Sequence, residues 1–103
     1  GLHLHAPVTV EYALPSGARR LWFSAEADLR GIDTAQRRWT DMHLIVRVDG
    51  REVLRRHITG DSQPQPINLE VTGRTLTIEV DPGRNGPVLD RLLLRQGVVY
   101  IEP

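Results

Sequence analysis

The sequence contains no lysine and no cysteine, and neither sign of charge is in excess. The missing lysine excludes Schiff-base chemistry, and the missing cysteine excludes disulfides, thiol nucleophiles and cysteine-ligated metal sites. All 13 basic residues are arginine, and 13 acidic residues balance them. Nucleic-acid-binding domains and polybasic membrane-surface domains usually carry a basic surplus, which this chain lacks. We therefore expect neither a nucleic acid nor a membrane among its partners.

Long apolar runs are missing as well. No segment approaches the roughly 20 apolar residues that cross a bilayer, and the start shows no signal-peptide pattern. Of the 103 residues, 40% are hydrophobic, which suffices to close one core but not two. The chain opens on Gly1 rather than on methionine. We expect residues 1–103 to form a single module excised from a larger protein.

Alternation of apolar and polar side chains runs through most of the sequence. Every second residue is apolar in 8–14, 21–27 and 42–48, which is the period of a half-buried strand. Asp49-Gly50 lies between two such runs and predicts a two-residue hairpin. About eight strands at a spacing of roughly 8–12 residues predict an all-β fold, an antiparallel β-sandwich of jelly-roll type. The remaining strands are expected at 52–58, 67–71, 76–80, 88–95 and 98–101.

Aromatic side chains are few, with two Trp, two Tyr and one Phe. Phe23 shares the apolar face of its strand and is expected in the core, so Trp22 points to the opposite face, toward solvent or a partner. Trp39 lies in 29–41, the longest stretch without strand alternation. There Asp33 precedes a potential helical turn, Thr34–Trp39, and its carboxylate is suited to cap that turn.

The surroundings of Trp39 leave two interpretations open. The ring lies beside Arg37, Arg38 and Asp41 in the sequence. A sugar can stack its C–H face on such a ring while neighbouring polar groups bind its hydroxyls. The alternative is that Trp39 folds back and plugs one end of the sandwich.

Catalytic patterns are missing from the sequence. No serine stands in a G-x-S-x-G context, and no glycine-rich loop precedes a helix that could hold phosphate. His3 and His5 would share one face of an extended segment, but two imidazoles do not complete a metal site. His43 and His57 have no partner in the sequence. We expect a protein that is not an enzyme.

Calcium is the one metal that the sequence leaves open. Strand-end and loop carboxylates suit calcium, which takes six to eight oxygen ligands, but no D-x-D-x-D-G run is present. We expect no cofactor, and the sequence does not settle whether a structural calcium binds. The carboxylates concerned are those of Asp28, Asp33, Asp81 and Asp90.

A succession of short motifs carries a family resemblance. His5-Ala6-Pro7 is followed by an alternating strand that ends in Tyr12-x-Leu14, then by a strand with central Phe23 and closing Asp28, then by the hairpin IVRVDGREV at 45–53. In this order the motifs resemble the NPCBM family of carbohydrate-binding modules. The likeness covers nearly the whole chain. It implies a galactose-binding-like β-sandwich that serves as a non-catalytic module of an exported bacterial protein, located outside the cell or in the periplasm.

The segment before the last core strand departs from the family pattern. The family usually carries a longer loop there with a His-x-Asp-Trp-type motif, whereas this sequence has NGPVLDRL at 85–92. Only Asp90 corresponds to that motif. The resemblance therefore points to the fold more strongly than to the individual ligand contacts.

Our hypothesis is that the module binds a neutral sugar at the loops of one end of the sandwich. Trp39 would stack on the sugar ring, and polar side chains nearby would bind the hydroxyls. The competing hypothesis is a structural or protein–protein interaction module that has lost the sugar site and contacts a neighbouring domain through Trp22, Arg20 and the edge strands. The predicted hydroxyl-binding residues are Asp28, Asp33, Asn85, Asp90 and Arg91.

Overall fold

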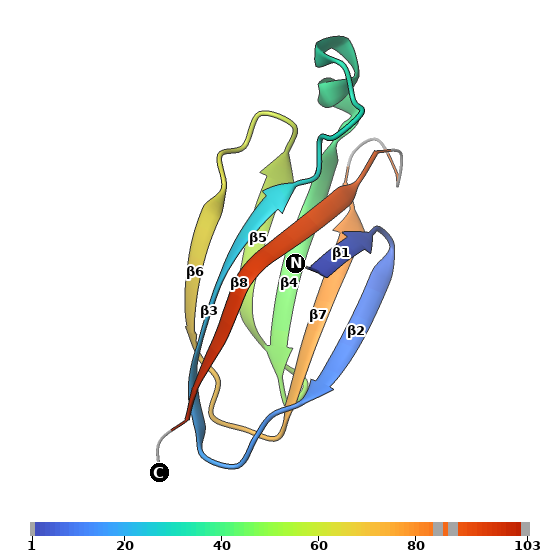
Figure 1. The fold of residues 1–103 in the computed structure, drawn as a ribbon. Coiled ribbons are helices and arrows are strands. Elements are labelled where there is room, and N and C mark those ends of the chain that lie inside the picture. Colours follow the sequence, from blue (N-terminus) through green and yellow to red (C-terminus); the bar gives the residue numbers. More distant parts are fainter. Residues whose placement is uncertain (1, 84–85, 87–88, 102–103) are drawn as a thin grey trace.

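The computed structural model describes residues 2–83, 86 and 89–101 (Figure 1). Eight strands form two antiparallel sheets of four, in the orders β1-β8-β3-β6 and β2-β7-β4-β5. This confirms the predicted all-β sandwich. The strands are β1 (Leu2–His5), β2 (Val8–Ala13), β3 (Ala18–Ala27), β4 (Asp41–Val48), β5 (Arg51–Thr59), β6 (Gln65–Glu70), β7 (Thr75–Pro82) and β8 (Arg91–Ile101).

The alternation in the sequence is what closes the core between the two sheets. On β3, Leu21, Phe23 and Ala25 are buried, whereas Trp22 between them is 39% exposed on the outer face. Facing side chains of the second sheet, such as those of β4 and β7, fill the same apolar cluster. Because successive strand side chains point to opposite faces, period two yields one buried and one solvated face per sheet.

Local turn chemistry behaves as the sequence predicts. Asp49 and Gly50 both have positive φ, 51° and 82°, which is the conformation that a two-residue hairpin between β4 and β5 requires. The only described helix is the 3₁₀ helix η1 (Thr34–Trp39), and Asp33 is its N-cap. None of the described residues forms a helix long and apolar enough to cross a membrane.

Two strands differ from the prediction. β8 runs from Arg91 through Gly97 to Ile101 as one strand instead of two separate runs. Its register to β3 shifts between the pairs Trp22–Val98 and Ser24–Arg95, so a bulge absorbs the break in alternation. The N-terminal segment forms β1, which pairs with the first part of β8 and precedes the cis Ala6–Pro7 bond.

η1 projects from one end of the sandwich, between β3 and β4 (Figure 1). Its base is fixed by a close backbone approach to Gly60, which follows β5. The Gly60 N–H donates to the carbonyl of Thr40 at 3.2 Å. A Cβ at Gly60 would lie 2.2 Å from the carbonyl oxygen of Arg37, so this approach requires glycine.

Candidate functional site

Three segments meet at the end of the sandwich that carries η1. The N–H of Asp28 donates to the carbonyl of Arg91 at 2.8 Å, which joins the end of β3 to the start of β8. The hydroxyl of Thr40 donates to the carbonyl of Leu89 at 2.9 Å, which joins the end of η1 to the segment before β8. The fold thus brings residues 28–41 and 89–91 to one end, as the site hypothesis requires.

Trp39 lies at the end of η1 with 42% of its surface exposed. This exposure excludes the alternative in which Trp39 plugs the end of the sandwich. The guanidinium carbon of Arg38 lies 5.3 Å from the centre of the indole ring, within range of a cation–π contact. Trp39 is therefore a solvent-accessible aromatic surface with a cation beside it.

Asp33 holds the start of η1. Its Oδ1 accepts the N–H of Gln36 at 3.0 Å, and Gln36 Oε1 accepts the N–H of Asp33 at 3.4 Å. Together these two bonds form a capping box. The capping role predicted for Asp33 is confirmed, and the carboxylate remains at the surface with one oxygen outside the capping box.

Asp28 is buried at the end of β3, where Arg30 holds its carboxylate from the same loop. Arg30 Nε donates to Oδ1 and Arg30 Nη2 donates to Oδ2, each at 2.9 Å. His3 Nδ1 lies 3.4 Å from Oδ2. These contacts, above all the hydrogen bond with Arg30, hold the pKa of Asp28 well below its usual range. Both carboxylate oxygens of Asp28 are thus occupied, and the exposed group is the Arg30 side chain.

Asp90 is fully buried, so it lies behind the surface at this end. Its Oδ1 accepts the N–H of Asp41 at 2.9 Å, which anchors the start of β4. Its Oδ2 has no hydrogen-bond partner among the described residues, and burial raises the pKa of the carboxyl group.

Arg91 follows at the start of β8 and is half-buried. Its Nη2 donates to the carbonyl of Arg30 at 3.2 Å, whereas its buried Nε has no partner within the described chain. Arg91 therefore supports the loop that carries Arg30. Asn85, the remaining predicted ligand residue, lies outside the described residues.

A groove of about 340 Å³, lined largely by charged side chains, lies at the loop that carries Asp28 and Arg30. Arg95 Nε and Glu26 Oε1 form an ion pair at 2.6 Å within it. The lining brings Asp28 together with Arg30, which the sequence analysis did not name, and with Arg37 from η1, which it named only as a polar neighbour of Trp39. The full lining is Glu26, Ala27, Asp28, Leu29, Arg30, Arg37, Leu93 and Arg95.

The arrangement of this end can be compared with that of known proteins. A family model of the NPCBM/NEW2 domain matches residues 1–95. The chain belongs to the NPCBM/NEW2 domain family. This confirms the family resemblance carried by the motifs between His5 and the 45–53 hairpin. No curated protein sequence matches the chain.

Solved structures similar to this NPCBM/NEW2 domain are CBM51 modules of Clostridium perfringens. One contains the M60 catalytic domain of ZmpB with two CBM51 domains, with a TM-score of 0.85 and 17% identity over 98% of this chain. A CBM51 from GH95 in complex with methyl-galactose has a TM-score of 0.79 and 17% identity, covering 95% of this chain and 68% of its own. CBM51-2 of ZmpB in complex with GlcNAc has a TM-score of 0.81 and 16% identity, covering 96% of this chain and 21% of its own.

At these identities the likeness establishes the fold of the NPCBM/NEW2 domain. The chain spans 11% of the length of the ZmpB structure with the M60 domain. The matching part of that structure is one section of a longer protein.

A second polar cluster of this NPCBM/NEW2 domain lies away from the groove, and the sequence analysis did not find it. His43 on β4 and His57 on β5 stack with ring centres 4.8 Å apart, and His57 Nε2 lies 2.6 Å from Asp41 Oδ1. The two histidines are direct cross-strand partners, so only strand register could have revealed the pair. Among the described residues no group of three or more His, Cys, Asp or Glu is arranged to hold a metal ion.

Proposed function

We propose that this NPCBM/NEW2 domain is a non-catalytic carbohydrate-binding module and that it binds a neutral sugar at the η1 end of the sandwich. The observation that carries the proposal is the exposed ring of Trp39 on a helix that also contributes Arg37 to a polar groove. An exposed aromatic face beside hydrogen-bonding side chains matches the mixed apolar and hydroxylated surface of a sugar.

In this proposal the residues at the η1 end of the sandwich have two kinds of role. Trp39 stacks on the sugar, and Asp33, Arg91 and Asn85 bind hydroxyls, joined by Arg30 and Arg37. Asp28 and Asp90 act from behind the surface, because Asp28 orients Arg30 and Asp90 anchors the start of β4. Buried, hydrogen-bonded groups of this kind fix the groups that contact a ligand.

The proposal assigns the carboxylates at this end to binding and support rather than to catalysis. Glycoside hydrolysis needs two carboxyl groups flanking the scissile bond. At this end Asp28 is paired with Arg30, Glu26 with Arg95, and Asp90 is buried. The arrangement suits binding without bond cleavage.

A neutral ligand and an exported parent protein are further parts of the proposal. Related CBM51 modules have been solved with methyl-galactose and with GlcNAc, both uncharged sugars, and balanced charge in this chain agrees with such a ligand. We place the module in a larger bacterial protein that acts outside the cell or in the periplasm. Loss of the sugar site, with the fold kept as an interaction module, is the competing outcome.

Binding to an array of neutral glycans tests the proposal. Trp39→Ala should weaken binding of any glycan that the native domain retains by about tenfold, or roughly 1.4 kcal/mol. Trp22→Ala is the matched control, because Trp22 has nearly the same exposure, 39% against 42%, but lies on the outer face of β3. Affinities of the retained glycan measured by calorimetry should be equal for the control and the native domain.

Two results would count against the sugar site. If the native domain binds no glycan on the array, the interaction module is favoured. Equal losses of sugar affinity in the two tryptophan variants would show that Trp39 has no special role.

A further inference from the structure

The groove at the η1 end has more positive than negative side chains. Its lining contains three arginines, Arg30, Arg37 and Arg95, and two acids, Glu26 and Asp28. Over the whole chain the two signs of charge balance. The groove is therefore locally positive in a chain without net charge.

Both acidic groups of the groove already have an arginine partner. Arg30 Nε and Nη2 donate to the two carboxylate oxygens of Asp28, each at 2.9 Å, and Arg95 Nε lies 2.6 Å from Glu26 Oε1. In each pair the arginine is the more exposed member. The exposed fraction is 71% for Arg30 against 8% for Asp28. It is 59% for Arg95 against 24% for Glu26. A ligand that enters the groove thus meets guanidinium groups before it meets a carboxylate.

Arg37 is the arginine of the groove whose charge is not compensated. Within the described residues its guanidinium group has no hydrogen bond and no ion pair. Its backbone is fixed, because its carbonyl accepts the N–H of Thr40 at 3.1 Å and lies against Gly60. The fold thus holds the main chain of Arg37 in place and leaves its side-chain N–H groups available to a ligand.

A free guanidinium group selects for anionic oxygen groups. Its planar array of N–H donors matches the paired oxygens of a carboxylate or a sulfate, and hydrogen bonds between charged partners are stronger than those to a neutral hydroxyl. Trp39 does not line the groove, but it is two residues from Arg37 on the same helix. A glycan with one unit on Trp39 can therefore place its next unit in the groove.

We propose that the groove binds an anionic oxygen group, a carboxylate or a sulfate, on the sugar unit next to the one that stacks on Trp39. Arg37 makes the paired hydrogen bonds to this group, and the outer N–H groups of Arg30 and Arg95 face it as well. The inference rests on the sugar site proposed above and names its ligand class. That class is a glycan with a neutral unit on Trp39 and an acidic unit beside it.

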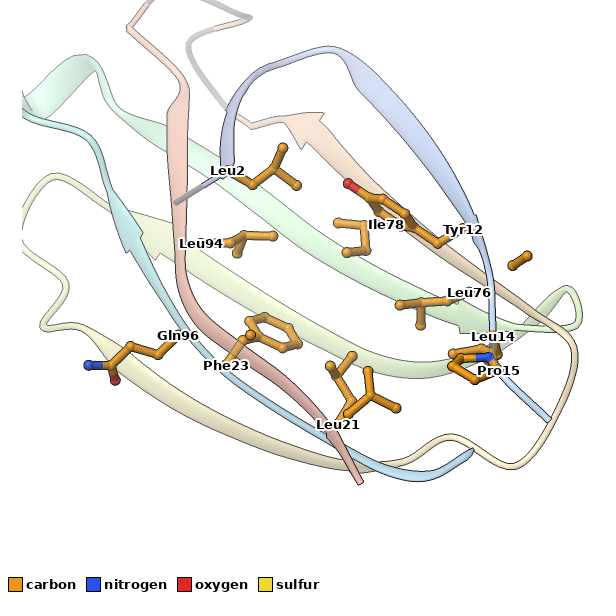
Figure 2. A pocket seen from close by; sticks show the side chains of 13 residues that line it. Leu2, Tyr12, Leu14, Pro15, Leu21, Phe23, Leu76, Ile78, Leu94 and Gln96 are labelled. Carbon is orange, nitrogen blue, oxygen red and sulfur yellow. The ribbon is translucent and has the colours of Figure 1, made fainter. Parts of the chain in front are cut away.

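The other groove of the domain has the opposite chemistry. It measures about 420 Å³ and opens between β8 and β2 (Figure 2). Its lining includes Leu21, Phe23 and Ile78, and none of the described residues that line it is charged. An anion there would lose its hydration without gaining a counter-charge, which is costly. The acidic unit therefore belongs in the groove beside η1.

Pairs of oligosaccharides that differ by one charged group test the inference. Lactose and N-acetyllactosamine are the neutral members, and the same glycans with a sialic acid or a sulfate on galactose are the carboxylate and sulfate arms. Because an exposed ion pair raises affinity by up to about fivefold, the native domain should bind at least one charged form about threefold to fivefold more tightly than its neutral parent. Calorimetry measures the affinities, and high salt should reduce the gain.

Arg37→Gln is the deciding variant, and its readout is the ratio of the charged to the neutral affinity. The ratio should fall to about one, because the unpaired charge is gone. Arg37→Lys keeps the charge but not the planar array of donors, so it should keep part of the gain.

Arg74→Gln is the matched control. It removes the same charge from another exposed arginine. Arg74 lies beside the hairpin that follows β4, whereas η1 precedes β4, so the two arginines are at opposite ends of that strand. The control should keep the native affinity ratio. Both positions are exposed, so both glutamine variants should also keep the native melting temperature.

Three results would overturn the inference. Equal affinities of the native domain for the neutral and charged members would do so while leaving the sugar site itself intact. A gain that survives Arg37→Gln, or that Arg74→Gln removes equally, would show that Arg37 does not bind the acidic group. Binding of no member of any pair would overturn the sugar site and the inference together.

Discussion

The domain exposes two tryptophans to nearly the same extent, 42% for Trp39 and 39% for Trp22, in different surroundings. Trp39 lies beside the Arg38 guanidinium, on the helix that contributes Arg37 to a groove of paired charges. Trp22 lies on the outer face of a sheet between its two cross-strand partners, Val98 of β8 and Asn68 of β6. Exposure alone therefore does not indicate what an aromatic side chain binds, whereas its neighbours do.

The two regions also differ in what holds them. At the η1 end, side chains bond to backbone groups far away in sequence, as Asp90 does to Asp41. Along the second half of β8, the contacts of the described residues are the ladder with β3 and the apolar core beneath. The η1 end thus has a preformed polar surface, whereas the second half of β8 exposes apolar side chains such as Val98 and Tyr100.

The largest expected effect concerns the apolar core between the two sheets. Phe23→Ala should lower the free energy of unfolding by about 3–5 kcal/mol, because it removes a buried aromatic ring and leaves a cavity. Urea denaturation followed by circular dichroism measures the change. Trp22→Ala, on the other face of the same strand, should cost clearly less, and a similar loss for both would show that the two faces of β3 do not differ as described.

The two tryptophans should differ in a sugar-binding assay. Trp39→Ala should lower sugar affinity by about tenfold, or roughly 1.4 kcal/mol, whereas Trp22→Ala should leave it unchanged, because Trp22 lies on the outer face of β3 beside Val98. Calorimetry with a glycan that the native domain retains measures both affinities. Equal losses for the two variants would show that the two exposed rings do not differ as described.

The smallest expected effects are opposite pH dependences of two aspartates at the η1 end. The pKa of Asp28 is lowered on folding, so its stabilising contribution is present at neutral pH and is lost as the pH falls below 3.8, the ordinary carboxyl value. The pKa of Asp90 is raised. Its unfolded carboxyl group therefore ionises first, and the free energy of unfolding falls as the pH rises from 3.8 through the folded value.

Urea midpoints measured across acidic pH check both signs. Asp28→Asn should lower the free energy of unfolding at neutral pH. It should also reduce the fall in that free energy as the pH drops below 3.8. Asp90→Asn should remove the fall in the free energy of unfolding that the native domain shows as the pH rises above 3.8, because an amide does not ionise. The amide oxygen can still accept the N–H of Asp41. A native profile that is unchanged by both substitutions would contradict the assigned environments.

Much of the fold was predictable because its signals are local. Alternation over 21–27 identified Phe23 as core and Trp22 as exposed, Asp49-Gly50 predicted the hairpin, and Asp33 predicted the start of η1. The boundaries of β8 were less predictable, because a bulge near Gly97 merges two runs into one strand. β1 is too short for alternation to identify it.

The candidate site was predictable only in part. The sequence pointed to Trp39 and to the segments at 28–41 and 89–91, which do meet. It did not indicate that Arg30 occupies both oxygens of Asp28, that Asp90 is buried, or that Arg37 lines the groove. These depend on where a loop turns back and on which side of a strand end faces solvent.

By itself the sequence determined an all-β sandwich without lysine or cysteine chemistry, because strand period, turn preference and composition are properties of neighbouring residues. Tertiary structure alone decided the surfaces. Asp41 meets Asp90 across 49 positions, and His43 stacks on His57 through strand register. Such contacts follow from which strands become neighbours, and long-range pairing of this kind leaves no local pattern in the chain.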